Sequence, residues 1–133
     1  MRNSLLAVAA LLLAACAANK STPIGEIAAL ASLEDVMDNQ ATTADPQFKK
    51  IGQAKFDDAE LGALATASDR IQATSNKTKD FAKGRAEFEA LAVKLNAKAK
   101  ALGAGATAKD PAAINAALTE MKATCKECHA KFR

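Results

Sequence analysis

Apolar residues recur at helical spacing along most of the chain, and no stretch shows the strict alternation of apolar and polar residues that predicts a strand. The pattern divides into four amphipathic stretches. Their apolar positions repeat every three or four residues, which places them on one face of a helix. We therefore expect an all-α fold. Because the stretches are joined by short connections, an antiparallel up-down-up-down four-helix bundle is the favoured architecture.

The first predicted helix begins at Thr22-Pro23, because Pro suits the first position of a helix. Its apolar face carries Ile24, Ile27, Leu30, Leu33 and Met37. Ser32, with Asp35 three residues later, is an alternative capped start. Asp45-Pro46 predicts either a kink or the start of a short helix. That short helix would carry Phe48, Ile51 and Phe56.

The second predicted helix begins at Asp57 or Asp58, since either side chain can cap it. Its inward face carries Leu61, Leu64, Ser68 and Ile71. The polar run 72–78 has no apolar member at helical spacing and predicts a turn.

The third predicted helix has a heptad seam, which suits packing at a shallow angle of about +20°. The seam comprises Phe81, Gly84, Phe88, Leu91, Leu95 and Leu102. Gly84 is expected inside this helix, where Gly costs about 1 kcal/mol relative to Ala. Gly103 and Gly105 predict its end.

The fourth predicted helix begins at Asp110-Pro111, a capping residue followed by Pro. Its seam comprises Ile114, Leu118, Met121, Cys125, Cys128 and Phe132. Two thiols therefore lie on the face that a bundle core requires. A cofactor held by those thiols would itself be part of the core.

The residues Cys125-Lys126-Glu127-Cys128-His129 form the C-x-x-C-H motif, which is the attachment site of a c-type haem. Both thiols can reach the two vinyl groups of one porphyrin as thioethers, and His129 can ligate the iron. A structural zinc site would need four ligands. Outside the motif the chain offers only Cys16 and no second His, so a zinc site lacks support. A redox-active pair of cysteines should open a helix that follows a strand, whereas no strand pattern precedes this motif. The motif therefore predicts one covalent haem c per chain, with a redox or metal site as the alternative.

The nine residues 125–133 resemble the C-terminal C-x-x-C-H-x-x-Tyr-Arg signature of class II c-type cytochromes, the cytochrome c′ family. Phe132 stands where the usual Tyr would be, so its hydroxyl is absent. The resemblance implies a four-helix bundle with the haem between helices near one end. It also implies that Arg133 lies near the proximal haem face, and that the protein is exported, because bacterial c-type haem is attached outside the cytoplasm.

The second axial position of the iron separates two functions. His129 is the only His in the chain, and Met37 is the remaining distal candidate, although Met most often fills gaps in a core. In low-spin members of the family that the chain resembles, a first-helix Met binds the iron. Such a protein transfers one electron between redox partner proteins. In high-spin members the position is open and binds a diatomic gas, nitric oxide or carbon monoxide.

The remaining function classes have less support in the sequence. A haem-free interaction module is a third reading, which requires that the thiols be unmodified. The chain shows no nucleophile–base pair and no substrate motif, so we do not expect an enzyme. The net charge of +3 falls to +2 without Arg2 of the leader, and no basic stripe with interleaved aromatics supports nucleic-acid binding. The sequence is compatible with both a monomer and a homodimer.

Residues 1–18 predict a bacterial signal peptide, with Arg2 before the apolar segment 5–13, which is too short to span a bilayer. Leu13-Ala14-Ala15-Cys16 resembles a lipobox, whose Cys is acylated and becomes the mature N-terminus. Ordinary cleavage after Ala17 or Ala18 is the alternative. Residues 19–133 would then form one periplasmic bundle. A lipidated Cys16 followed by the non-acidic Ala17 would anchor that bundle to the outer membrane.

Overall fold

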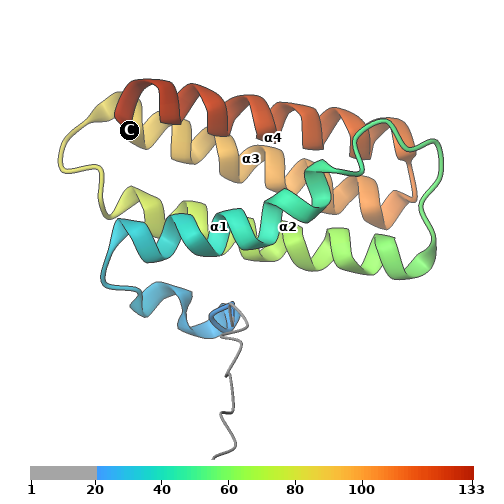
Figure 1. Cartoon of the computed structure of the whole chain (residues 1–133), viewed down its shortest axis with the longest axis horizontal. Coiled ribbons are helices and arrows are strands. Elements are labelled where there is room, and N and C mark those ends of the chain that lie inside the picture. Colours follow the sequence, from blue (N-terminus) through green and yellow to red (C-terminus); the bar gives the residue numbers. More distant parts are fainter. Residues whose placement is uncertain (1–20) are drawn as a thin grey trace, which may run out of the picture.

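Five helices account for most of residues 21–133, which are the residues that this computed structural model describes (Figure 1). They are the 3₁₀ helix η1 (Ile24–Ala29) and the α-helices α1 (Leu33–Phe48), α2 (Asp58–Lys79), α3 (Ala86–Ala108) and α4 (Pro111–Phe132). This part of the chain contains no strand, so the expected all-α four-helix bundle is confirmed. The predicted signal peptide and Cys16 lie outside the described residues.

The four α-helices do not pack equally tightly. Helix α3 packs extensively against both α2 and α4, whereas α1 packs mainly against α2 and touches α4 at only a few points. The fully buried core side chains are Val36, Leu64, Ile71, Leu102, Ile114, Leu118 and Met121, joined by Ile27 from η1. The wall between α1 and α4 is therefore the least closed side of the bundle. None of the helices in the described residues is long and apolar enough to cross a membrane.

The first predicted helix is in fact two elements, η1 and α1. The backbone N–H of Asp35 donates to the side chain of Ser32 at 3.1 Å, so the alternative capped start is the correct one. Pro46 begins no separate helix but lies in the last turn of α1. Pro removes one backbone donor there, and the helix ends two residues later, so little of the helical hydrogen bonding is disturbed.

The predicted turn over residues 72–78 is wrong, because α2 continues through it to Lys79. Thr74, Ser75 and Thr78 are buried, and each hydroxyl donates to a carbonyl of its own helix. Bonding of this kind satisfies a buried hydroxyl without water. A polar run can therefore continue a buried helix, which its composition did not indicate.

The prediction for α3 was wrong at both ends. Phe81 and Gly84 lie in the loop before it, where Gly84 adopts a φ of +79°, a left-handed conformation that favours glycine. Gly103 and Gly105 do not end the helix but lie within it. A Cβ on Gly103 would meet Ser68 Oγ at 2.6 Å, and one on Gly105 would meet the backbone nitrogen of Ile114 at 3.1 Å. These glycines let α3 approach its neighbours closely.

The starts of α2 and α4 agree with their predicted caps. Asp57 and Glu60 form a reciprocal capping box at the start of α2. At α4, the Asp110 carboxylate accepts from the N–H groups of Ala112 and Ala113 at 2.9 and 3.2 Å, and Pro111 follows it directly. Such a cap stabilises a helix by about 1 kcal/mol. The N-terminus of α4, the helix that carries the C-x-x-C-H motif near its C-terminus, is thus stabilised by this cap.

Candidate cofactor site

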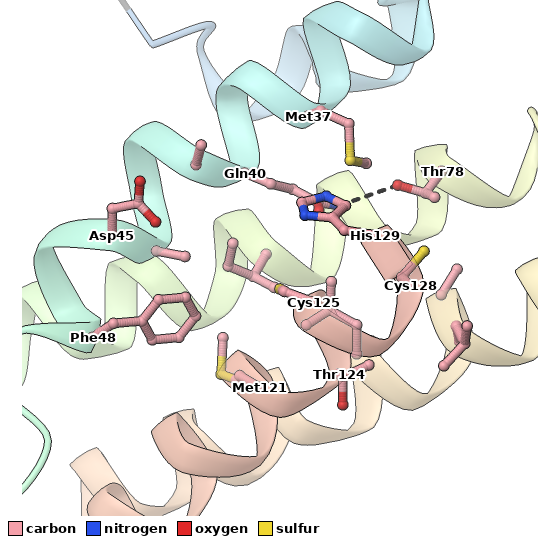
Figure 2. A pocket seen from close by; sticks show the side chains of 16 residues that line it. Met37, Gln40, Asp45, Phe48, Thr78, Met121, Thr124, Cys125, Cys128 and His129 are labelled. Atoms are coloured by element: carbon pink, nitrogen blue, oxygen red, sulfur yellow. Dashed lines mark hydrogen bonds between the residues drawn. The ribbon is translucent and has the colours of Figure 1, made fainter. Parts of the chain in front are cut away.

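A pocket with an apolar lining opens between α1 and the C-terminal half of α4 (Figure 2). The cavity itself has a volume of about 100 Å³, and it widens into an open mouth. Helix α4 contributes Met121, Thr124, Cys125, Cys128 and His129, and α1 contributes Met37, Gln40, Ala41, Ala44, Asp45 and Phe48. Side chains of α2 and α3 close the inner end. They are Ile71, Thr78, Leu91, Ala92 and Leu95.

The three motif residues of α4 all line this pocket. Cys125 and Cys128 are half-buried free thiols on successive turns of the helix. His129 is exposed at the mouth. Figure 2 shows the three side chains around the same opening as Met37. The helical spacing predicted that both thiols would share a face, and the fold directs that face into a cavity.

The pKa values of both thiols are raised in the haem-free protein. Burial raises the pKa of the Cys125 thiol to about 11, and the neighbouring Cys128 and the Asp45 carboxylate add to this. Burial also raises the pKa of Cys128, while the guanidinium of Arg85 partly opposes the rise. A redox-active cysteine has a lowered pKa, so these thiols lack that property. Within residues 21–133, no three His, Cys, Asp or Glu side chains gather as a metal site.

Met37 reaches the same pocket from the opposite wall. It lies half-buried on α1, and its side chain faces the region of Cys128 and His129 (Figure 2). Met121 is also in the pocket, but it is fully buried on the helix that carries His129. The fold therefore brings together all the residues between 21 and 133 that the sequence singled out as cofactor or iron ligands.

The charged residues near the motif have different surroundings. Lys126 is exposed, whereas the ammonium group of Lys131 forms an ion pair with Glu87 and lies 3.9 Å from the Glu127 carboxylate. Arg133 is exposed, and its backbone N–H donates to the carbonyl of His129 at 3.2 Å. Its backbone thus lies beside His129. The proximity of its guanidinium to a haem face stays a prediction.

Sequence reasoning missed a hydrogen-bonded pair of polar residues in the pocket wall. The side-chain amide of Gln40 donates to the hydroxyl of Thr78 at 3.1 Å, and both residues are buried (Figure 2). Gln40 lies three residues after Met37, so helical spacing already placed it on the same face. Thr78 had no such signal, because its segment was predicted to be a turn.

The lining has the chemistry that a c-type haem requires. Two thiols on one wall match the two porphyrin vinyl groups, and an imidazole and a thioether are established axial ligands of haem iron. Aliphatic and aromatic side chains supply the apolar surface that a porphyrin ring buries. The residues present therefore fit haem.

An α-helical bundle whose last helix places two thiols and an imidazole in an apolar pocket has the features of a bundle-type haem protein. Residues 24–133 match the family model described as Cytochrome C', and the chain belongs to this family. The chain is 51% identical over 47 residues to the cytochrome c′ of Pararhodospirillum photometricum, a match that covers 35% of this chain and 38% of that protein. No solved structure matches the chain significantly.

Proposed function

We propose that this protein is a periplasmic cytochrome that carries one covalent haem c and transfers one electron at a time between redox partner proteins. The observation that carries the proposal is that Cys125, Cys128, His129 and Met37 line one pocket. Cys125 and Cys128 would hold the porphyrin, each S–H adding across one vinyl C=C bond without a leaving group. His129 would bind the iron from the α4 side and Met37 from the α1 side. The haem would supply the one-electron redox chemistry.

The residues of the pocket support electron transfer in two ways. Phe48, Leu91 and Leu95 line the pocket with apolar surface, which would limit the access of water to a bound haem. In such a setting the surroundings reorganise little when the charge changes. Met37 and His129 come from different helices, so the bundle would hold both axial positions filled in either oxidation state.

One observation favours the alternative of a gas-binding cytochrome. Helix α1 makes few contacts with α4, so Met37 belongs to the least tightly held wall of the pocket. If Met37 stays off the iron, the axial position is open to nitric oxide or carbon monoxide, and the surrounding apolar side chains would favour such small uncharged ligands. The choice between the two functions depends on Met37.

Covalent haem attachment is tested by intact-mass measurement. The protein is expressed with a c-type maturation system, denatured and weighed, and its mass should exceed that of the polypeptide by one haem. Cys125→Ala and Cys128→Ala should each remove one thioether, and the double variant should lose haem on denaturation. A wild-type mass equal to that of the bare polypeptide would refute this part of the proposal.

The sixth ligand is tested by visible spectroscopy of wild type and Met37→Ala. The reduced wild type should show sharp low-spin bands and resist carbon monoxide, and Met37→Ala should become high-spin and bind the gas. Met121→Leu is the matched control, because Met121 lines the same pocket from the helix of His129. A wild type that is already high-spin, with an unchanged spectrum in Met37→Ala, would instead establish the gas-binding function.

Export and anchoring are proposed from residues 1–18 alone. Cells that express the wild type should incorporate labelled palmitate into the protein and retain it in the outer-membrane fraction. Cys16→Ala should remove the label. A wild-type protein that fractionates freely with the periplasm and begins at Asn19 would show that the lipid anchor is wrong, while export would stand.

A further inference from the structure

The amide of Gln40 is held in one orientation by a short hydrogen-bond relay. The hydroxyl of Thr78 donates to the backbone carbonyl of Thr74 at 2.9 Å. A carbonyl can only accept, so the single proton of the Thr78 hydroxyl is used there. Thr78 must then accept from Gln40, which directs the amide nitrogen of Gln40 toward α2 at 3.1 Å. In the flipped amide, the carbonyl oxygen of Gln40 would face Thr78, and the hydroxyl would have to give up its bond to Thr74 in order to donate to that oxygen.

The other end of the same amide faces the pocket. Within residues 21–133, Oε1 of Gln40 accepts no hydrogen bond. In the same residues, Oε1 of Gln47 is the side-chain oxygen that is both fully buried and without a hydrogen-bond partner, so Oε1 of Gln40 is not fully enclosed by protein atoms. Oε1 of Gln40 therefore reaches open space. Since Gln40 is buried and lines the pocket, that space is the pocket. The oxygen is the negative end of the amide dipole, and it lies on the wall that also carries Met37.

We infer that Gln40 lowers the midpoint potential of the haem iron, and that Thr78 is the positioning residue that holds the amide of Gln40 in the required orientation. This inference rests on the proposed function. Oxidised haem carries one more positive charge than reduced haem, and the attraction between that charge and a fixed carbonyl oxygen is screened less in a water-poor pocket than in bulk water. Hydrogen bonding and burial around haem are among the means by which a protein sets the potential. Gln40 thus favours the oxidised state.

The test is a redox titration of the haem-loaded wild type and of Gln40→Leu, which removes the amide and keeps an apolar side chain. At a fixed applied potential, the ratio of reduced to oxidised protein should rise about tenfold, which is about 59 mV for one electron. Gln47→Leu is the matched control. It makes the same change two turns along α1, at a residue that does not line the pocket, and should leave the midpoint unchanged.

Two variants of Thr78 separate orientation from packing. Thr78→Val removes the hydroxyl and frees the amide of Gln40 to turn its N–H groups toward the pocket, so the midpoint should rise. Thr78→Ser keeps the hydroxyl and should restore the wild-type value. A purely structural role would lower the free energy of unfolding in Thr78→Val without moving the midpoint.

The outcomes distinguish this inference from the proposed function. A midpoint in Gln40→Leu that equals or falls below that of wild type and of Gln47→Leu would overturn the inference alone. A wild type without covalent haem or a reversible one-electron couple would overturn the proposed function and the inference with it. If Gln40→Leu does not fold, Thr78→Val carries the same prediction: a raised midpoint supports the inference, and an unchanged midpoint overturns it.

Discussion

The ring of Phe132 packs edge-on against the ring of Phe88, with centroids 5.3 Å apart and planes at 85°. The guanidinium of Arg85 lies 4.4 Å from the Phe88 centroid and 5.5 Å from that of Phe132. The same guanidinium donates to the carbonyls of Ala82 and Phe81, both at 3.0 Å. The last turn of α4, which carries His129, is therefore tied to the start of α3 and to the loop before it.

Replacing Phe132 by Ala should lower the free energy of unfolding by about 1 to 2 kcal/mol, because it removes half-buried apolar area and the edge-to-face contact. Urea titration of the haem-free protein, followed by circular dichroism, measures this loss. Phe132→Tyr is the control, since it keeps the ring and should stay close to wild type. An equal loss in Phe132→Tyr would show that the ring contact is not what stabilises this end of α4.

Gly103→Ala should destabilise the protein by about 1 to 3 kcal/mol, although Ala is the better helix former. The new methyl group would meet Ser68, whose hydroxyl donates to the carbonyl of Ala99 at 2.7 Å in the core. Gly62→Ala is the matched control on exposed helix surface, where a Cβ meets no atom within 4 Å. It should stabilise the protein by about 1 kcal/mol. If both variants are stabilised, the helices are not in close contact at Gly103.

Asp110→Ala should lower the free energy of unfolding by about 1 kcal/mol, since two N–H groups at the start of α4 lose their acceptor. Asp110→Asn keeps a side-chain oxygen at the same position and should lose much less. Thermal unfolding of the two variants beside wild type measures the difference. A similar loss in both would indicate that the charge of Asp110, rather than its capping bond, stabilises α4.

The haem-free protein should lose stability between about pH 9 and pH 11. The pKa of Cys125 is raised from 9.0 to about 11 in the folded state, so in this window the unfolded chain has released the thiol proton and the folded chain still holds it. The stabilisation is fully present below pH 9 and is lost as the pH rises through 11, in total about 3 kcal/mol. Urea titrations across this range measure it.

Cys125→Ala is the control for this pH dependence, because it removes this thiol and leaves the other side chains, Cys128 among them, unchanged. Its stability should fall less steeply over the same window. Identical slopes in the two proteins would contradict the raised pKa of Cys125. Attachment of haem consumes the thiol, so the loaded wild type should also lack this contribution.

The sequence by itself determined the class of fold and the starts of α2 and α4, offered the Ser32 cap of α1 as an alternative start, and placed the two thiols of the predicted haem site on one helix face. The caps Ser32, Asp57 and Asp110 each act on an N–H group two or three residues away. The C-x-x-C-H motif lies within five consecutive residues, and helical geometry places both thiols on one face. Interactions of such short range are visible in the order of the residues, because no distant segment is needed to form them.

Only the tertiary structure decided where α2 and α3 end. Thr74 and Ser75 are buried, and Asn96 of α3 donates to Ser75 at 3.1 Å, so a run that resembles a turn continues as helix. Gly103 lies within α3 and is a site of close packing, because a Cβ there would meet the hydroxyl oxygen of Ser68 on α2 at 2.6 Å. In both cases the deciding atoms belong to another helix, and the local pattern holds no information about them.

The pocket was decided in the same way. Met37 and Gln40 lie on α1, and Cys125 lies at the other end of the chain on α4, yet all three line one cavity. Helical spacing placed each on the inward face of its own helix, but it could not set the rotation and height of one helix against another. Those are set by packing between helices, which is why the relay from Gln40 to Thr78 is found only in the folded protein.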